Sequence, residues 1–162
     1  MRECQTLIST KIVKIDVMPT IKRRKIEPYS AAQMYQLVND VLSYPQFLPW
    51  CKNTRIVSQT EGEMIAAIEI AKGPLNKWFE TRNFLFENHR IELTLHSGPF
   101  KKLQGFWEFI PIDEQKCEIS FELNFEFSFG PLALLAEPIF HGITANMIEA
   151  FSNRAKIVYG NS

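Results

Sequence analysis

The side chains of this sequence that could carry out acid–base or metal chemistry are few and scattered. Its three histidines, His89, His96 and His141, have no partner at i, i+4 spacing and no acidic or thiol neighbour at the spacing of metal ligands. The sequence also contains no G-x-S-x-G nucleophile elbow and no phosphate-binding glycine loop. These residues therefore predict neither a metal site nor a catalytic site.

Bulky apolar side chains are far more abundant than reactive ones. The chain has 13 Phe, 3 Trp and 4 Tyr residues, so its core or a pocket must hold much flat apolar surface. Its 18 basic and 18 acidic residues give a net charge of zero, so no overall electrostatic attraction draws the protein to nucleic acid or to an anionic membrane. The aromatic content is the first indication of a cavity for a ligand.

Length and composition are those of one globular domain. At 162 residues, with 46% hydrophobic and 22% charged residues, the chain can bury about two thirds of its unfolded surface. No apolar run approaches the roughly 18 residues of a membrane span, and residues 1–17 lack the continuous apolar core of a signal peptide. Cys4, Cys51 and Cys117 are odd in number and far apart. We therefore expect a protein of the reducing cytoplasm.

Three elements are predicted before the middle of the chain. Residues 21–26 read as a short basic strand, which Pro28 ends. A helix follows at about 30–40, because Ser30 and Gln33 form a capping box ahead of apolar residues at helical spacing. The segment Tyr44–Cys51 holds two prolines among large apolar residues, so it predicts a short helical turn or an irregular loop.

Residues from about 52 to 129 predict a meander of six antiparallel strands, because turn signals recur at intervals of about 10 residues. The last strand is the clearest, since the odd-numbered residues from Cys117 to Phe129 are apolar and polar residues alternate with them. Its odd-numbered face should therefore be buried.

The C-terminal part of the chain returns to helical periodicity. After an interruption at Pro138, one long helix over about 139–159 should lie across the sheet with an apolar stripe toward it. The predicted fold class is α+β: a curved antiparallel sheet of about seven strands, two short helices and a long C-terminal helix, which is a helix-grip arrangement.

Five motifs resemble those of the coenzyme Q-binding protein family, whose bacterial branch is also called the ribosome-association toxin. The motifs are Pro28–Ala31, Met34–Val38, Tyr44–Cys51, Gly98–Leu103, and Ala145–Met147 with Ala150 and Phe151. They spread over about residues 18–159. The resemblance implies a START-like domain over residues 18–160, a hydrophobic tunnel and no catalytic residues. Residues 1–17 match nothing in the family and are interpreted as an extension outside the core.

A quinone has an aromatic head with two carbonyl acceptors and a long prenyl tail, so its host needs an apolar channel with a few donors near one end. Phe47, Leu48 and Trp50 would form a lid over that channel, or equally would plug the end of the core. Simple packing of sheet against helix would produce the same apolar pattern. The candidate lining residues are Phe47, Leu48, Trp50, Trp107, Phe121, Leu123, Phe125, Phe127, Leu135, Ile143, Met147 and Phe151.

Two sets of charged residues are candidates for polar contacts. Arg82 would anchor a head group, although a solvent-facing pair with Glu80 is the commoner arrangement of such neighbours. Arg23 and Lys25, with Lys101 and Lys102, would contact ribosomal RNA or anionic lipid, or would simply protect an edge strand from pairing with another sheet.

Three hypotheses follow. The first is a non-enzymatic carrier of ubiquinone or a related prenyl lipid that supports cellular respiration, requires no cofactor and contacts the inner face of the membrane peripherally. The second is a factor that binds the large ribosomal subunit and blocks its joining to the small one. The third is an aromatase or cyclase-type enzyme that would use Arg82, Glu80 and His96. Neither composition nor motifs suggest DNA as a partner.

Overall fold

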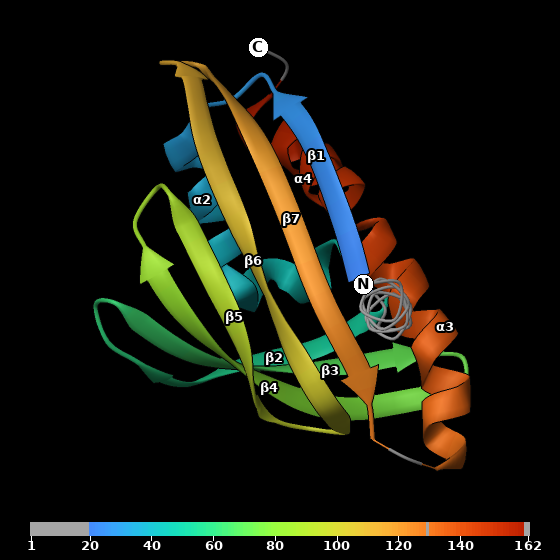
Figure 1. Ribbon diagram of the computed structural model, residues 1–162. Helices are drawn as coiled ribbons and strands as arrows, with labels where there is room; N and C mark the ends of the chain where they lie inside the picture. The colour runs from blue at the N-terminus through green and yellow to red at the C-terminus, as the bar shows by residue number, and fades with distance from the viewer. Residues whose placement is uncertain (1–19, 129, 161–162) are drawn as a thin grey trace, which may run out of the picture.

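The fold is a single strongly curved antiparallel sheet that wraps around helices on its concave side. The computed structural model describes residues 20–128 and 130–160. Within them, seven strands pair in the order β1-β7-β6-β5-β4-β3-β2 (Figure 1). The strands are β1 (Thr20–Glu27), β2 (Cys51–Gln59), β3 (Glu63–Lys72), β4 (Leu75–Phe86), β5 (Arg90–Ser97), β6 (Phe100–Asp113) and β7 (Lys116–Phe127). The predicted fold class and the six-stranded meander are confirmed.

The hairpins form where the turn signals lie, and the sheet bends where a side chain is missing. Gly73 and Asn88 take the positive φ angles of 57° and 64° that tight turns require. Gly105 lies in the middle of β6, where an added Cβ would come within 2.1 Å of the Glu122 carbonyl oxygen. This close approach lets β6 and β7 curve around the helices.

The first two helices match the sequence pattern closely. α2 (Ala31–Asn39) begins with the predicted capping box, in which the Gln33 amide donates to Ser30 Oγ at 3.1 Å and the Ser30 amide donates to Gln33 Oε1 at 2.9 Å. A short 3₁₀ helix, η1 (Val41–Gln46), follows and contains Pro45. A short helical turn is therefore present, although it begins three residues before Tyr44.

The prediction of one long C-terminal helix starting after Pro138 is wrong. The structure has two helices, α3 (Pro131–Ala145) and α4 (Met147–Tyr159), and Pro138 lies inside α3. Pro138 is accommodated because the carbonyl that it leaves without a helical partner belongs to Leu134, an exposed residue. The break falls at Asn146, whose side chain donates to the Gly142 carbonyl oxygen at 2.9 Å and competes with the helical ladder.

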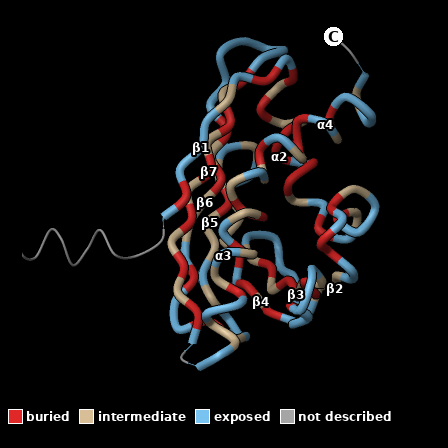
Figure 2. Tube along the Cα trace, turned by 90° about the vertical axis from the view of Figure 1, so that its right-hand side faces the viewer, coloured by how far each residue is buried: buried red, intermediate tan, exposed pale blue. Residues whose placement is uncertain are grey.

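The core lies between the concave face of the sheet and the helices (Figure 2). On β7 the odd-numbered residues from Cys117 to Phe127 are all buried, which confirms the predicted face; Phe129 lies outside the described residues. β1 is fastened to α4 by the buried Glu27 carboxylate, which accepts a hydrogen bond from Ser152. The helices therefore close the open side of the sheet.

The predicted extension, residues 1–17, lies outside the described residues, so the proposed division at residue 18 stays a prediction. Within the described part of the chain, no helix has the length and apolar character needed to cross a membrane.

Candidate functional site

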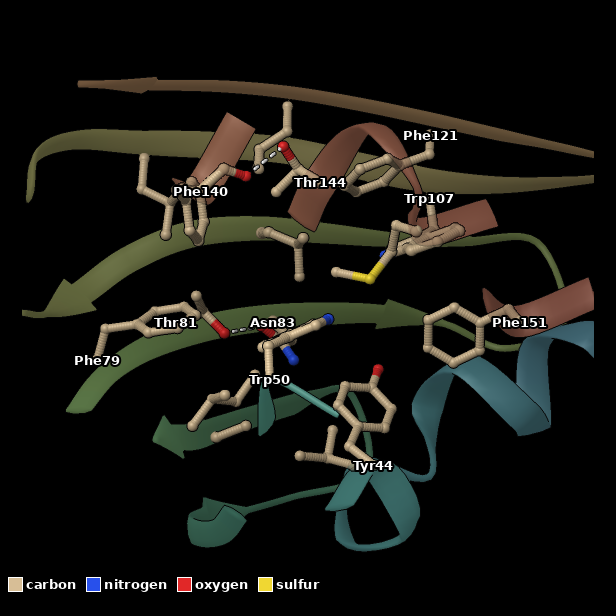
Figure 3. Close-up of a pocket in the computed structure, with 17 residues that line it drawn as sticks. Tyr44, Trp50, Phe79, Thr81, Asn83, Trp107, Phe121, Phe140, Thr144 and Phe151 are labelled. Atoms are coloured by element: carbon tan, nitrogen blue, oxygen red, sulfur yellow. Dashed lines mark hydrogen bonds between the residues drawn. The ribbon is translucent and has the colours of Figure 1, made fainter. Parts of the chain in front are cut away.

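An apolar pocket lies between the sheet and the two C-terminal helices (Figure 3). It encloses about 80 Å³ of free space. Eight of the elements, η1, β3 to β7, α3 and α4, contribute to its lining, together with Trp50 in the segment that follows η1. The lining residues are Val41, Tyr44, Trp50, Ala66, Ile68, Phe79, Thr81, Asn83, Leu93, Leu103, Trp107, Phe121, Leu123, Phe140, Thr144, Met147 and Phe151.

Two aromatic clusters bound the pocket at opposite ends in Figure 3. One surrounds Phe140 of α3, whose ring lies 4.8 Å from Phe125 and 5.1 Å from Phe100 between centroids. The other surrounds Phe151 of α4, whose ring meets Trp107 edge-on at 5.3 Å. Trp107 also stacks on Phe121 at 4.3 Å. Packed rings therefore bound the free space at both ends, and its wall includes Thr144 and Met147, on either side of the break between α3 and α4.

The pocket carries a small set of polar groups between those clusters. Thr81 and Asn83 point inward from β4, are only 6% and 5% exposed, and are joined by a hydrogen bond from Thr81 Oγ1 to Asn83 Oδ1 of 2.8 Å. Thr144 of α3 donates to the Phe140 carbonyl oxygen at 2.9 Å. Tyr44 donates to the Val38 carbonyl oxygen. These hydroxyl hydrogens are therefore all directed to protein acceptors.

Among residues 20–128 and 130–160, no charged side chain lines the pocket, and burial keeps Tyr44 and the neighbouring Cys51 neutral. Burial raises the pKa of Tyr44 well above its ordinary value, with smaller contributions from Cys51 and Asp40. Burial, and then the Glu69 carboxylate, raises the pKa of the neighbouring Cys51 thiol to about 12. The site therefore suits an uncharged, largely apolar ligand.

The pocket and a groove on the surface share two side chains near the break between α3 and α4. Trp50 and Met147 line both the pocket and an outer groove of about 310 Å³, which also includes Lys72, Asn146 and Asn153. A thioether side chain is flexible and adapts to different neighbours. Met147 and Trp50 are therefore the side chains that separate the pocket from solvent.

Six of the twelve candidate lining residues lie on the pocket wall: Trp50, Trp107, Phe121, Leu123, Met147 and Phe151. The other six lie elsewhere. Leu48 and Ile143 line the outer groove, and Phe125 and Phe127 pack around Phe140. Phe47 packs against Phe151 at 5.3 Å and also lies off the wall. Leu135 is 54% exposed, because α3 turns that position away from the sheet, so its assignment to the lining is wrong.

The assignment of Arg82 as a polar anchor is also wrong, because even-numbered residues of β4 face away from the pocket. Arg82 instead pairs with Glu63 at 3.1 Å on the outer face, and His96 pairs there with Glu80 at 2.9 Å. The inward polar residues are Thr81 and Asn83, which sequence reasoning missed. Their alternation with outward residues, in phase with the buried Phe79, was the available signal.

The four basic candidates do not form one surface. Lys25 pairs with Glu149 at 3.2 Å, and Lys101 pairs with Glu126 at 3.5 Å, so both take part in ion pairs of the fold. Lys102 lies opposite Glu126 of β7, whereas Arg23 lies opposite Phe121. Five residues of a strand span about 17 Å, so these two cations are well separated.

In the described residues, no group of three or more His, Cys, Asp or Glu side chains could hold a metal ion.

An apolar pocket between a curved antiparallel sheet and C-terminal helices defines a helix-grip protein. Residues 28–152 match the family model described as polyketide cyclase / dehydrase and lipid transport, and the chain belongs to this family. The chain is 50% identical over 143 residues to a protein of Escherichia coli strain K12 named ribosome association toxin RatA, covering 88% of this chain and 90% of that protein. The family resemblance inferred from the motifs is confirmed.

Two further comparisons extend the relationship. A Xenopus laevis protein named coenzyme Q-binding protein COQ10 homolog B, mitochondrial, is 28% identical over 140 residues, which are 84% of this chain and 57% of that protein. The crystal structure of the Zhui aromatase/cyclase from a Streptomyces species superposes with a TM-score of 0.76 at 13% identity, covering 90% of this chain and 99% of that one. At that identity, the likeness shows the fold alone.

Proposed function

We propose that this chain binds ubiquinone or a related prenyl lipid in the pocket, catalyses no reaction and thereby supports respiration as a carrier. The observation that carries the proposal is the lining: a largely apolar wall with a few inward polar groups and, in the part of the chain that the structure describes, no charged side chain. The relationship to a protein named for coenzyme Q binding supports the same ligand class.

The absence of catalysis is supported by the protonation of the site. Tyr44 is the titratable side chain on the wall, and its raised pKa keeps it neutral at physiological pH. The acid–base pair Glu80 and His96 lies on the outer face of the sheet. A general acid or base must reach the substrate directly or through one water, so this pair cannot serve a ligand in the pocket.

Ligand entry requires side chains to move, because about 80 Å³ is below the 300–1,000 Å³ typical of small-molecule sites. Each buried CH₂ of a prenyl tail contributes about 0.8 kcal/mol, so a few isoprene units offset a modest rearrangement. Met147 is the side chain that we expect to move, since it separates pocket from groove and has three rotatable bonds.

The test is quinone recovery from protein purified from a quinone-producing host, by solvent extraction and mass spectrometry. Met147→Glu places a charge on the pocket wall and should lower recovery at least tenfold, because a tail cannot solvate that charge. Ile157→Glu is the matched control, since its side chain lies on the same helix, α4, and is 74% exposed. Equal recovery from folded Met147→Glu protein, or none from the parent even after reconstitution with excess quinone, would defeat the proposal.

A carrier must also meet the membrane from which it takes its ligand, and α3 offers a surface for that contact. Leu134 and Leu135 are 82% and 54% exposed near the start of the helix, where residues 131–136 include no charged side chain. Replacing both with Ser should reduce flotation with phospholipid vesicles severalfold. Ile157→Ser on α4, where the side chain is 74% exposed, is the control; equal losses from both variants would count against this surface.

Ribosome association is the second candidate function, favoured by the 50% identical relative named for it and by the edge strand β1. Lys22, Arg23 and Arg24 are exposed, and no acidic partner for them is found among residues 20–128 and 130–160. Such cations are available for phosphates, and each phosphate contact adds salt-dependent affinity. The factor would then bind the large subunit and block its joining to the small one.

This second candidate is tested by co-sedimentation with large subunits at several salt concentrations. Replacing Lys22, Arg23 and Arg24 with Ala should weaken binding and flatten its dependence on salt. Replacing Lys101 and Lys102 serves as the matched control on the other hairpin. Unchanged binding and an unchanged salt slope in the β1 variant would remove this edge as the contact.

A further inference from the structure

The hydrogen-bonding groups of the pocket are unequally distributed between donors and acceptors. The hydroxyl hydrogens of Tyr44, Thr81 and Thr144 are each directed to an oxygen of the protein. The Asn83 side-chain oxygen accepts the bond from Thr81, and the reverse orientation of this amide would leave the Thr81 hydrogen without an acceptor. The hydroxyl hydrogens on this wall are therefore already engaged, and the hydroxyl oxygens can only accept further bonds.

The nitrogens of the wall are not engaged in the same way. Across the described residues, no hydrogen-bond partner is found for Asn83 Nδ2, Trp107 Nε1 or Trp50 Nε1. In that part of the chain, two side-chain atoms are both fully buried and without a partner, namely Asn39 Oδ1 and Arg154 Nε. The three nitrogens are not among them, so each of the three keeps some accessible surface. Asn83 and Trp107, which are 5% and 4% exposed, both line the pocket, and their side chains point into it in Figure 3.

We infer that the pocket selects the oxidised quinone over the corresponding quinol, with Asn83 as the principal donor to a ring carbonyl and Trp107 as the second. This inference rests on the proposed function, since it concerns the ligand of the same site. Free N–H groups that lose water when a ligand enters need acceptors, and the two carbonyl oxygens of a quinone are acceptors only.

A quinol matches these donors and acceptors of the pocket wall poorly. Its hydroxyl oxygens can accept from the same N–H groups, but each also brings a hydrogen that needs an acceptor inside the pocket. The remaining acceptors are lone pairs on hydroxyls that already donate elsewhere. A site built to satisfy one hydrogen-bonding pattern discriminates strongly against a ligand that leaves a donor unpaired. We expect quinone to bind about tenfold more tightly than quinol of the same tail length.

The experiment is calorimetric titration of the parent with a short-tailed ubiquinone and, under anaerobic conditions, with its quinol. Asn83→Leu removes the donor at similar volume and should lower quinone affinity about tenfold while changing quinol affinity less, so the ratio falls toward one. Trp107→Phe keeps a ring but removes the second donor, and provides the same test if Asn83→Leu does not fold. Arg82→Leu, on the outer face of the same strand, is the control and should retain the parent's ratio.

The outcomes separate the two levels of the proposal. Binding of neither ligand to the parent would defeat the proposed function. Equal affinity for quinone and quinol would leave the carrier intact and overturn the inferred selectivity. A parent ratio that persists in both Asn83→Leu and Trp107→Phe would overturn the assignment of these donors.

Discussion

At the scale of single residues, Gly105 allows β6 and β7 to approach more closely than any side chain would permit. An alanine Cβ would lie 2.1 Å from the Glu122 carbonyl oxygen and 2.9 Å from Leu123 Cα, both of them backbone atoms. Gly105→Ala should therefore cost about 3 kcal/mol or more of unfolding free energy, as measured in urea. Gly142→Ala meets nothing within 4 Å inside α3 and should gain about 0.5–1 kcal/mol. Equal effects of the two changes would refute the packing at β6.

The buried thiols predict a loss of stability at alkaline pH. Burial raises the pKa of Cys51 to about 12 and that of Cys117 to about 11, from an ordinary 9.0. Above pH 9 the unfolded chain releases these protons while the folded chain keeps them, so the unfolding free energy falls as pH rises, by roughly 1.4 kcal/mol per pH unit for each thiol.

The measurement is urea unfolding at several values between pH 7 and pH 10.5. Replacing both Cys51 and Cys117 with Ala should flatten the decline above pH 9, whatever it does to stability at neutral pH. A variant whose pH dependence runs parallel to the parent's would show that other groups cause it.

The residues of the site were predictable where a single period governed them and not elsewhere. Alternation on β7 placed Phe121 and Leu123 correctly on the wall, and helical spacing placed Met147 and Phe151 there. The buried face of a strand is predicted from the regular spacing of its apolar residues. Asn83 is polar and interrupts that spacing, so the pattern does not identify it as an inward residue. The charge of Arg82 favours it as an anchor for a head group, but its position on β4 directs it outward to Glu63. The sequence also does not show which charged residues form ion pairs, since Lys25 bonds to Glu149, which lies 124 residues away in the chain.

At the scale of elements, β7 divides into residues that pack and residues that border the pocket. Phe125 is fully buried against Phe140, so Phe125→Ala should cost about 3–5 kcal/mol. Phe121 already borders free space, so Phe121→Ala removes fewer contacts and should cost about 1–2 kcal/mol less. Urea unfolding of the two variants provides the comparison. A larger loss for Phe121→Ala would mean that the pocket is not where the structure has it.

The elements themselves followed from local signals, with one exception. Turn residues fixed the six hairpin-connected strands, and the capping box at Ser30 fixed the start of α2. The break at Asn146 was not predicted because the apolar stripe continues through it from Ile143 to Met147. What ends α3 there is a side-chain bond to the Gly142 carbonyl oxygen, which periodicity does not reveal.

At the scale of the whole molecule, the pocket and the basic edge belong to different parts of the fold. The pocket wall includes no residue of β1, and the groove that shares Trp50 and Met147 with the pocket lies at the junction of α3 and α4. Lys22, Arg23 and Arg24 lie on β1, an edge strand of the sheet (Figure 1). The proposed ligand binding and the proposed ribosome association would therefore use separate surfaces, and we expect variants that affect one to leave the other unchanged.

This independence gives the last prediction, a double-variant experiment with two readouts. Met147→Glu should lose quinone but co-sediment with large subunits as the parent does, whereas the triple Ala variant of Lys22, Arg23 and Arg24 should do the reverse. The combined variant should show the two losses without any additional effect, because distant sites without shared partners act additively. If Met147→Glu also abolishes co-sedimentation while remaining folded, the two functions are coupled, and an occupied pocket is then part of what the ribosome recognises.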